Sequence, residues 1–234
     1  MFKALKNRAF TLVELLVVIS ILGLLAGLAV PAINRGLSSA KAGACLSNLR
    51  QIGIATLAYA AENQMRLPDA GSGMDPAWAK SLTNFVSAKA DKKNTIFVCP
   101  GALKPVLNAG NDTEIALTYG MHGGLMPRGT NGLQLNAIAR PSEVILCADM
   151  CQNPGNKGWS PNSIESPSIF VSQSAGRGAV DLEQAISTTT DNDNGNNPWM
   201  RYRHNGKVNV VMTDGHAEAI TKGKVLNKHV IYGQ

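Results

Sequence analysis

Aromatic side chains are scarce in this sequence of 234 residues, at 5% of the chain, and charged residues make up only 16%. Hydrophobic residues reach 44%, so the chain has enough apolar surface to form a folded core. The formal net charge of +6 includes three cations, Lys3, Lys6 and Arg8, that precede a long apolar run. The rest of the chain is only mildly basic and has no Lys/Arg cluster with interleaved aromatics. This composition argues against a nucleic acid as partner.

Motifs of common catalytic and metal sites are also absent from the sequence. There is no G-x-S-x-G, no H-E-x-x-H, no P-loop and no clear nucleophile–base pair. None of the four cysteines has C-x-x-C spacing, and no nearby pair of histidines completes a zinc pattern. We therefore expect no enzyme activity, no cofactor and no metal site of the usual zinc kind.

The longest apolar run lies near the N-terminus, in RAFTLVELLVVISILGLLAGLAVPA, residues 8–32. The 19 residues from Leu15 to Ile33 carry no charge. As a helix they span about 28 Å, close to the thickness of about 30 Å of a bilayer's hydrocarbon core. Because cations precede the run, we expect a single membrane pass with the N-terminus in the cytoplasm.

A carboxylate, Glu14, interrupts the apolar run. An acidic residue at the centre of a membrane helix costs roughly 2.5–3.5 kcal/mol, so its presence needs an explanation. One interpretation is a secretory signal cleaved after the small-x-small site Gly27-Leu28-Ala29. Another is a plain signal anchor in which Glu14 lies near the membrane interface and reaches the headgroups.

A third interpretation uses every residue of the run, which resembles the N-terminus of type IV prepilins and type II secretion pseudopilins. The resemblance implies that prepilin peptidase removes a cytoplasmic leader, residues 1–9, and that the new amine of Phe10 is methylated. The residue before the cut is usually Gly in the family, and here it is Ala9. The resemblance further implies that Glu14 pairs with the terminal amine of a neighbouring subunit during assembly and that Pro31 bends the helix.

Helical periodicity continues after the membrane segment, so we expect one helix over residues 10–62 that forms the membrane anchor and filament core. Residues 52–61, IGIATLAYAA, are apolar nearly all round, which predicts burial of this part against a sheet of the same chain. Residues 45–68, together with FVCP at 97–100, also resemble prepilin-like proteins of planctomycete- and verrucomicrobial-type bacteria.

Residues 63–234 are predicted to form a globular head with an antiparallel sheet, which makes the fold α+β and pilin-like. Residues 76–88 fit a short helix with an early proline. Runs rich in β-branched residues between Gly, Pro and Asn predict the strands Thr95–Cys99, Ile115–Tyr119, Glu143–Ala148, Ser168–Val171, Val208–Thr213, Ala217–Thr221 and His229–Tyr232.

The clearest motif of the head is RHNGKVNVVMTDGHAEAI, residues 203–220. Its spacing of His204 and Asp214-Gly215 resembles the prepilin-type processing-associated domain named for H-X9-DG. Asn205-Gly206 and Asp214-Gly215 are favoured turn dipeptides, so one interpretation is a β-meander in which His204 bonds across the Asp214 turn. The other is a ligand or metal site made by His204, Asp214 and His216.

The segment DNDNG suggests a calcium site at Asp191 and Asp193, because alternating carboxylates supply oxygen ligands. Its match to an EF-hand loop is poor, since the glycine comes one place early and no Glu follows at the required distance. A solvated Asn/Asp-rich turn is the alternative interpretation.

The cysteines allow two disulfides in an oxidising compartment. We expect Cys45 to pair with Cys99, because the long helix and the FVCP segment should pack together, and Cys147 with Cys151, closing a small loop. The alternative is four buried thiols that act as small apolar side chains.

Together these features predict a structural subunit of a type IV pilus or a secretion pseudopilus. We expect a single-pass protein of the bacterial inner membrane, with its head in the periplasm, or outside the cell once in a filament. Its partners would be prepilin peptidase and other pilin or pseudopilin subunits. The alternative is a membrane-tethered envelope binding module that never polymerises.

Overall fold

The computed structural model describes residues 12–71, 77–86, 96–103, 115–127, 129–153, 163–164, 181–186, 188, 191–193 and 199–233. Its residues group into two compact units, Met1–Ala40 and Lys41–Gln234. We call the second one the C-terminal unit. It includes the later part of the long helix α1 as well as the sheet.

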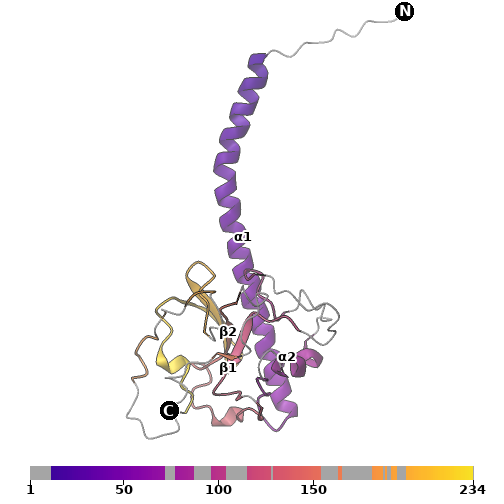
Figure 1. Ribbon diagram of the computed structural model, residues 1–234, viewed down its shortest axis with the longest axis vertical. Helices are drawn as coiled ribbons and strands as arrows, with labels where there is room; N and C mark the ends of the chain where they lie inside the picture. The colour runs from indigo at the N-terminus through magenta and orange to yellow at the C-terminus, as the bar shows by residue number, and fades with distance from the viewer. Residues whose placement is uncertain are drawn as a thin grey trace, which may run out of the picture. The chain divides into compact units, whose positions relative to one another are not determined.

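Helix α1 runs from Leu12 to Glu62 (Figure 1), which confirms the predicted helix over the described residues. It continues through Pro31 without a break. Apolar side chains of its first part are exposed, with Leu12 at 78% and Leu28 at 71%. The helix is long and apolar enough to cross a membrane, because a span of about 20 apolar residues suffices.

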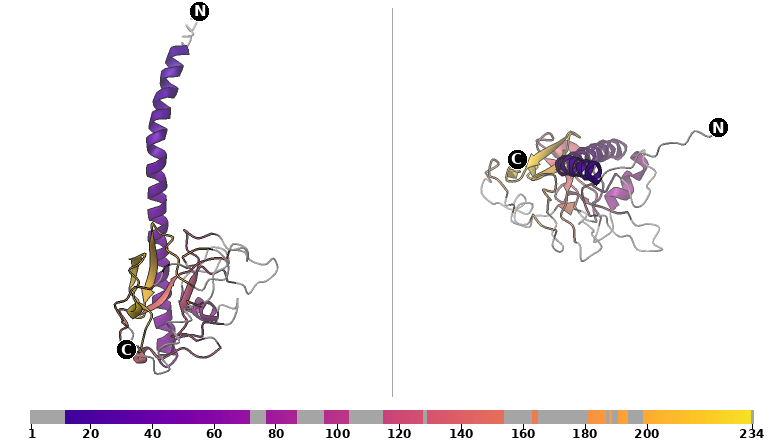
Figure 2. Two further views of the ribbon diagram at one scale, coloured as in Figure 1. Left: turned by 60° about the vertical axis from the view of Figure 1, so that its left-hand side comes forward. Right: turned by 90° about the horizontal axis from the view of Figure 1, so that it is seen from above.

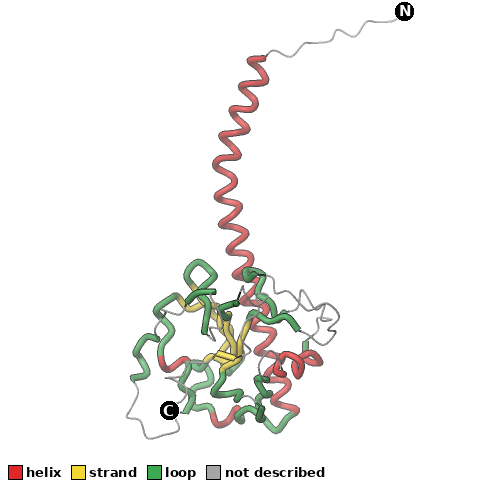
Figure 3. Tube along the Cα trace, viewed as in Figure 1, coloured by secondary structure: helices red, strands yellow, loops and turns green. Residues whose placement is uncertain are grey.

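The C-terminal unit holds a five-stranded sheet in the order β3-β1-β2-β4-β5 (Figure 3). Four strands pair antiparallel, and β3 joins the edge parallel to β1. Their bounds are Tyr119–His122 for β1, Ile145–Asp149 for β2, Ser163–Ile164 for β3, Lys207–Met212 for β4 and Ala217–Thr221 for β5. The predicted α+β fold, a long N-terminal helix followed by an antiparallel sheet, is thus confirmed.

The predicted strands were right where the chain forms local hairpins. The last hairpin, β4 and β5, matches the prediction to within a residue. The prediction was wrong for Thr95–Cys99, whose described residues form a turn, and for His229–Tyr232, whose first residue ends the short 3-10 helix Asn227–His229. It was also wrong for Ile115–Tyr119, because the strand there begins only at Tyr119. Ser168–Val171 lies outside the described residues. The predicted short helix appears as α2, Ala77–Leu82, followed by a 3-10 turn, Thr83–Phe85.

Apolar side chains cover both faces of the sheet. On one face Cys147 and Val211 pack with Leu49 and Ile52 of α1 and with Trp78 of α2, and Figure 2 shows the later part of α1 beside the sheet. On the other face, strand residues pack with residues of the 199–202 and 225–231 segments.

The later part of α1 buries only one side of the helix. Ile52, Ala55 and Thr56 are buried, whereas Ile54 is 57% exposed. The predicted burial of this part of the helix against a sheet of the same chain is therefore confirmed, with the sheet covering one face of the helix.

Candidate functional site

The N-terminal candidate residues fall on both sides of the first described residue. Ala9 and Phe10 lie outside the described residues. Glu14 lies in the first turn of α1, among exposed apolar side chains, and Pro31 lies farther along the same helix. The hydroxyl of Ser20 donates to the carbonyl of Leu16, 2.7 Å away, which satisfies this hydroxyl within the helix itself.

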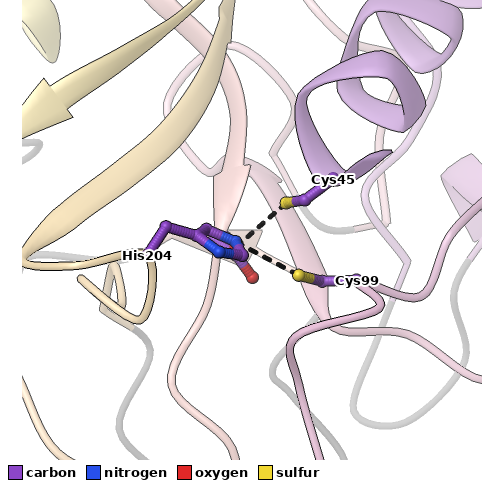
Figure 4. Close-up of side chains that lie close together, drawn as sticks. Cys45, Cys99 and His204 are labelled. Carbon is purple, nitrogen blue, oxygen red and sulfur yellow. Dashed lines mark hydrogen bonds and ion pairs between the residues drawn. The ribbon is translucent and has the colours of Figure 1, made fainter. Parts of the chain in front are cut away.

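A second group of functional side chains is buried in the C-terminal unit. It consists of Cys45, Cys99, Asp149 and His204, whose Sγ, carboxylate and imidazole atoms all lie within 4.8 Å of one another. Figure 4 shows Cys45 and Cys99 side by side, with His204 pointing toward them. All four residues are 5% exposed or less. We call these four residues the Cys-Asp-His cluster.

Asp149 is the centre of the hydrogen bonding in the cluster. Its Oδ2 accepts from Nε2 of His204 at 2.8 Å and from the thiol of Cys45 at 3.1 Å. Its Oδ1 accepts from Nε of Arg203 at 3.0 Å. Arg203 also donates to Oε1 of Gln152, 3.1 Å away. The buried carboxylate therefore has charged partners on both oxygens, which offsets much of the cost of burying it.

The thiol of Cys99 lies beside the imidazole. Its Sγ is 3.3 Å from Nε2 of His204 and accepts the backbone N–H of Gly101 at 3.3 Å. The hydrogen bond with Cys45 and, to a smaller extent, the one with His204 lower the pKa of Cys99 to about 6 overall, although burial opposes this. Burial, in contrast, raises the pKa of Cys45. Cys99 thus carries the thiolate of the pair and Cys45 the thiol.

Burial lowers the pKa of His204, but the hydrogen bonds with Asp149 and then Cys99 raise it, to about 9 overall. The imidazole is therefore protonated at neutral pH and faces two anions. Such a set of sulfur, nitrogen and oxygen donors, with one low-pKa thiol, is suited to binding a metal ion. The side chains come from four separate segments of the chain.

Local structure fixes each member of the cluster. Cys45 lies on α1. Cys99 lies at the start of a turn, and the residue before it is held to α1, because the side-chain amide of Asn48 donates to the carbonyl of Val98 at 3.2 Å. Asp149 ends β2. His204 opens the hairpin leading to β4, where the N–H groups of His204 and Lys207 each donate to the other residue's carbonyl.

The hairpin turn beside His204 is the turn predicted from Asn205-Gly206. Both residues have positive φ, 52° and 74°, as a two-residue type I′ turn requires. The second predicted turn also forms: Gly215, with φ of 91°, closes the β4–β5 connection, and its N–H donates to the carbonyl of Met212.

The residues of the H-X9-DG motif do not meet in one site. Nδ1 of His216 lies 2.6 Å from Oδ1 of Asp214 at the exposed β4–β5 turn, whereas His204 lies at the other end of β4. The predicted site of His204, Asp214 and His216 is therefore wrong, and so is the bond from His204 across the Asp214 turn. His204 binds Asp149 instead.

Comparison with known protein families matches residues 5–30 to the family described as the prokaryotic N-terminal methylation motif. The chain carries a prepilin-type methylation motif. The match contains Ala9, Phe10 and Glu14 and supports assignment to the prepilin and pseudopilin class. No solved structure matches the chain.

The four cysteines do not form the expected disulfides. None of the four, all of them described, forms a disulfide. Cys45 and Cys99 do lie close together, as expected, but as two unbridged cysteines of the cluster. Cys147 and Cys151 cannot close a small loop, because the chain between them is extended through the end of β2. Extended residues four apart are separated by about 13 Å, too far for a disulfide.

The two carboxylates proposed as calcium ligands form ion pairs with basic side chains of the same chain. Asp191 accepts from Arg201 at 2.7 Å and from Lys222 at 2.6 Å, and Asp193 accepts from Arg201 at 3.0 Å. The backbone N–H of Gln152 also donates to Asp193, at 2.9 Å. This arrangement does not support a calcium site, because the carboxylates are already neutralised.

Sequence reasoning missed the Cys-Asp-His cluster of the C-terminal unit. Zinc patterns are recognised by short spacings between ligands, and these four residues are far apart in the sequence. One usable signal was present: a cysteine followed by Pro-Gly at 99–101, in a segment expected to pack on the helix that carries Cys45.

Proposed function

We propose that this chain is a structural subunit of a type IV pilus or a type II secretion pseudopilus. Prepilin peptidase removes residues 1–9 and methylates Phe10, and the processed chain assembles with other pilin or pseudopilin subunits. The observation that carries the proposal is the methylation motif at residues 5–30. Most of the motif lies in α1, and the apolar side chains of this part of the helix are exposed.

The exposed apolar side chains of α1 support assembly on physical grounds. A helix apolar on all sides is stable only inside a membrane or in contact with other apolar helices. Large exposed apolar side chains run along the first part of α1, from Leu12 to Leu37. The membrane covers these apolar side chains before assembly, and the helices of neighbouring subunits cover the same side chains in the filament.

Glu14 is the residue that distinguishes a filament subunit from a simple anchor. Cleavage after Ala9 creates a positive amine at Phe10, and a charge in a membrane is best explained by a charged partner. We assign that partner to the amine of a neighbouring subunit, which fixes the register of assembly. Loss of one partner of a buried pair costs about 3–5 kcal/mol, so misaligned subunits are disfavoured.

The proposal places the protein in the bacterial inner membrane, with its N-terminus in the cytoplasm and its C-terminal unit in the periplasm. It assigns the protein no enzymatic activity. The rival function, a tethered envelope module that does not polymerise, uses the same anchor but has no need of Glu14.

The first test is the mass of the N-terminal peptide of the protein isolated from its native membrane. A chain that begins with N-methylated Phe10 supports the proposal. A chain that begins at Val30 identifies a secreted protein instead, and an intact Met1 favours the tethered module.

The second test measures incorporation into filaments. Glu14→Ala should abolish incorporation while leaving membrane insertion intact, because it removes the charge that fixes the register. Ser20→Ala is the matched control, since it removes a polar group of the same helix that bonds within the helix. Equal incorporation of Glu14→Ala and wild type would favour the tethered module.

A further inference from the structure

The donor atoms of the Cys-Asp-His cluster are spaced almost as they are around a tetrahedral metal ion. Bond lengths of about 2.0 Å to nitrogen and oxygen and about 2.3 Å to sulfur require donors about 3.3–3.8 Å apart. Three separations within the cluster are 2.8, 3.1 and 3.3 Å, and all lie within 4.8 Å. Shifts of at most about 1 Å in these side chains bring all the separations to the tetrahedral values.

The types of donor select the ion. Two thiols, one imidazole and one carboxylate form a mixed soft and borderline set, which suits Zn²⁺ far better than Ca²⁺ or Mg²⁺. Four protein ligands fill a tetrahedral zinc shell, and all four are buried. A closed and buried shell is typical of a structural site, because a catalytic zinc keeps one position open for water.

Charge is also compensated when zinc binds. As metal ligands both cysteines are thiolates and Nε2 of the imidazole is deprotonated, so Zn²⁺ balances two of the three anionic ligands. Arg203, whose guanidinium bonds Oδ1 of Asp149, supplies the positive charge that offsets the third anionic ligand. The Gly101 N–H directed at Sγ of Cys99 stabilises a thiolate there.

We propose that Cys45, Cys99, Asp149 and His204 form a structural zinc site that fastens the later part of α1 to the sheet of the C-terminal unit. The ligands are Sγ of Cys45 and Cys99, Oδ2 of Asp149 and Nε2 of His204. This inference goes beyond the proposed function and does not depend on it, since all four ligands lie within the C-terminal unit.

Such a site has a mechanical consequence for the chain. Its ligands belong to α1, the 99–101 turn, the end of β2 and the hairpin before β4. One ion therefore joins the helix and the turn to two paired strands of the sheet. Binding energy of a structural zinc adds directly to folding energy. The zinc ion would therefore hold the sheet and the 99–101 turn on the later part of α1 within the C-terminal unit.

The test uses the full chain in detergent micelles, reduced and stripped with a chelator, then titrated with Co²⁺. We expect one ion per chain, with the visible bands of tetrahedral cobalt and a near-ultraviolet thiolate-to-cobalt band, both removed by added Zn²⁺. Cys99→Ala should weaken binding at least tenfold. Cys151→Ala is the matched control, because Cys151 is also a buried thiol but lies outside the cluster.

Two results would overturn the zinc site. One is the absence of a thiolate–cobalt band, or a band equally strong in Cys99→Ala and wild type. The other is a Cys45–Cys99 disulfide in protein isolated from its native membrane, because the oxidised pair cannot bind the ion.

A measurement on unmutated protein covers the case in which Cys99→Ala does not fold. Native mass spectrometry of the wild-type chain should show one zinc ion in place of two protons, and a strong chelator should remove it and lower the melting temperature. Zinc-free protein whose melting temperature does not respond to added Zn²⁺ would overturn the proposal by itself.

Discussion

Nε2 of His204 and Oδ2 of Asp149 lie 2.8 Å apart in the interior of the C-terminal unit. The pair joins the start of the last hairpin to the end of β2. Asp149 is fully buried and the side chain of His204 is 4% exposed, so water does not screen the interaction. This single contact gives the histidine of the H-X9-DG motif a structural role that the turn-forming residues of the same motif do not share.

Space for the His204 ring depends on Gly101. A Cβ at Gly101 would lie 2.9 Å from Cε1 of His204, so Gly101→Ala should displace the ring and destabilise the protein by about 1–3 kcal/mol. The measurement is the free energy of unfolding from a denaturant titration of the chain in micelles.

A double-mutant cycle isolates this clash. In a His204→Ala background the ring is absent, so adding Gly101→Ala should cost little. An equal cost in both backgrounds would show that the alanine acts through the backbone and not through the ring.

A second glycine brings α1 close to the sheet. A Cβ at Gly53 would lie 2.6 Å from Cγ2 of Val211, whereas a Cβ at Gly43 has nothing within 4 Å. Because both substitutions gain the same helix propensity of about 1 kcal/mol, their difference measures the contact alone. We expect Gly53→Ala to be less stable than Gly43→Ala by about 1–3 kcal/mol. Similar melting temperatures for the two variants would contradict the close approach.

His122 should make the C-terminal unit sensitive to acid. Burial lowers its pKa from 6.5 to about 4. Its Nδ1 accepts the N–H groups of Gly124 and Leu125, both at 3.1 Å, while Nε2 donates to the carbonyl of Val230 at 2.8 Å. A proton on Nδ1 would break both accepted bonds, so the folded state holds the neutral form.

The sign of the pH dependence follows from this lowered pKa. Between pH 6.5 and about 4 the unfolded chain protonates this histidine and the folded chain does not, so stability is lost as the pH falls. The loss should total about 3 kcal/mol for this residue and level off below pH 4. Urea midpoints across this range provide the measurement, and His122→Gln should flatten the profile. An unchanged profile in that variant would exclude His122 as the cause.

Calcium should not stabilise the protein through Asp191 and Asp193. Both carboxylates already bind Arg201, and Asp191 also binds Lys222, so a calcium ion would have to displace these cations. The melting temperature with calcium should equal that with the same concentration of magnesium. An increase in melting temperature that is specific to calcium and disappears in Asp191→Asn would show that these carboxylates do bind calcium.

Sequence reasoning succeeded where the signal is local. The apolar run and its periodicity predicted α1, and turn dipeptides such as Asn205-Gly206 predicted the last hairpin, because backbone preferences within a few residues determine both. It failed for the predicted strand Thr95–Cys99, because its described residues, 96–99, form a turn although the segment is rich in β-branched and aromatic residues. It also failed to find the Cys-Asp-His cluster, because the contacts of Cys45 and Cys99 with Asp149 and His204 are set by tertiary packing.

Processing of the leader depends on the residue before the cut. Ala9 stands where the prepilin-like family usually has glycine. We expect its methyl group to fit the active site of the peptidase less well than glycine does. Ala9→Gly should therefore raise the rate of leader removal several-fold, and Ala9→Leu should block it. The measurement is the fraction of processed chain in membranes after a pulse of synthesis, with Ala4→Gly as the matched control, because that residue lies in the leader but away from the cut. Equal processing of all four chains would place the cleavage at another bond and separate this protein from the prepilin pathway.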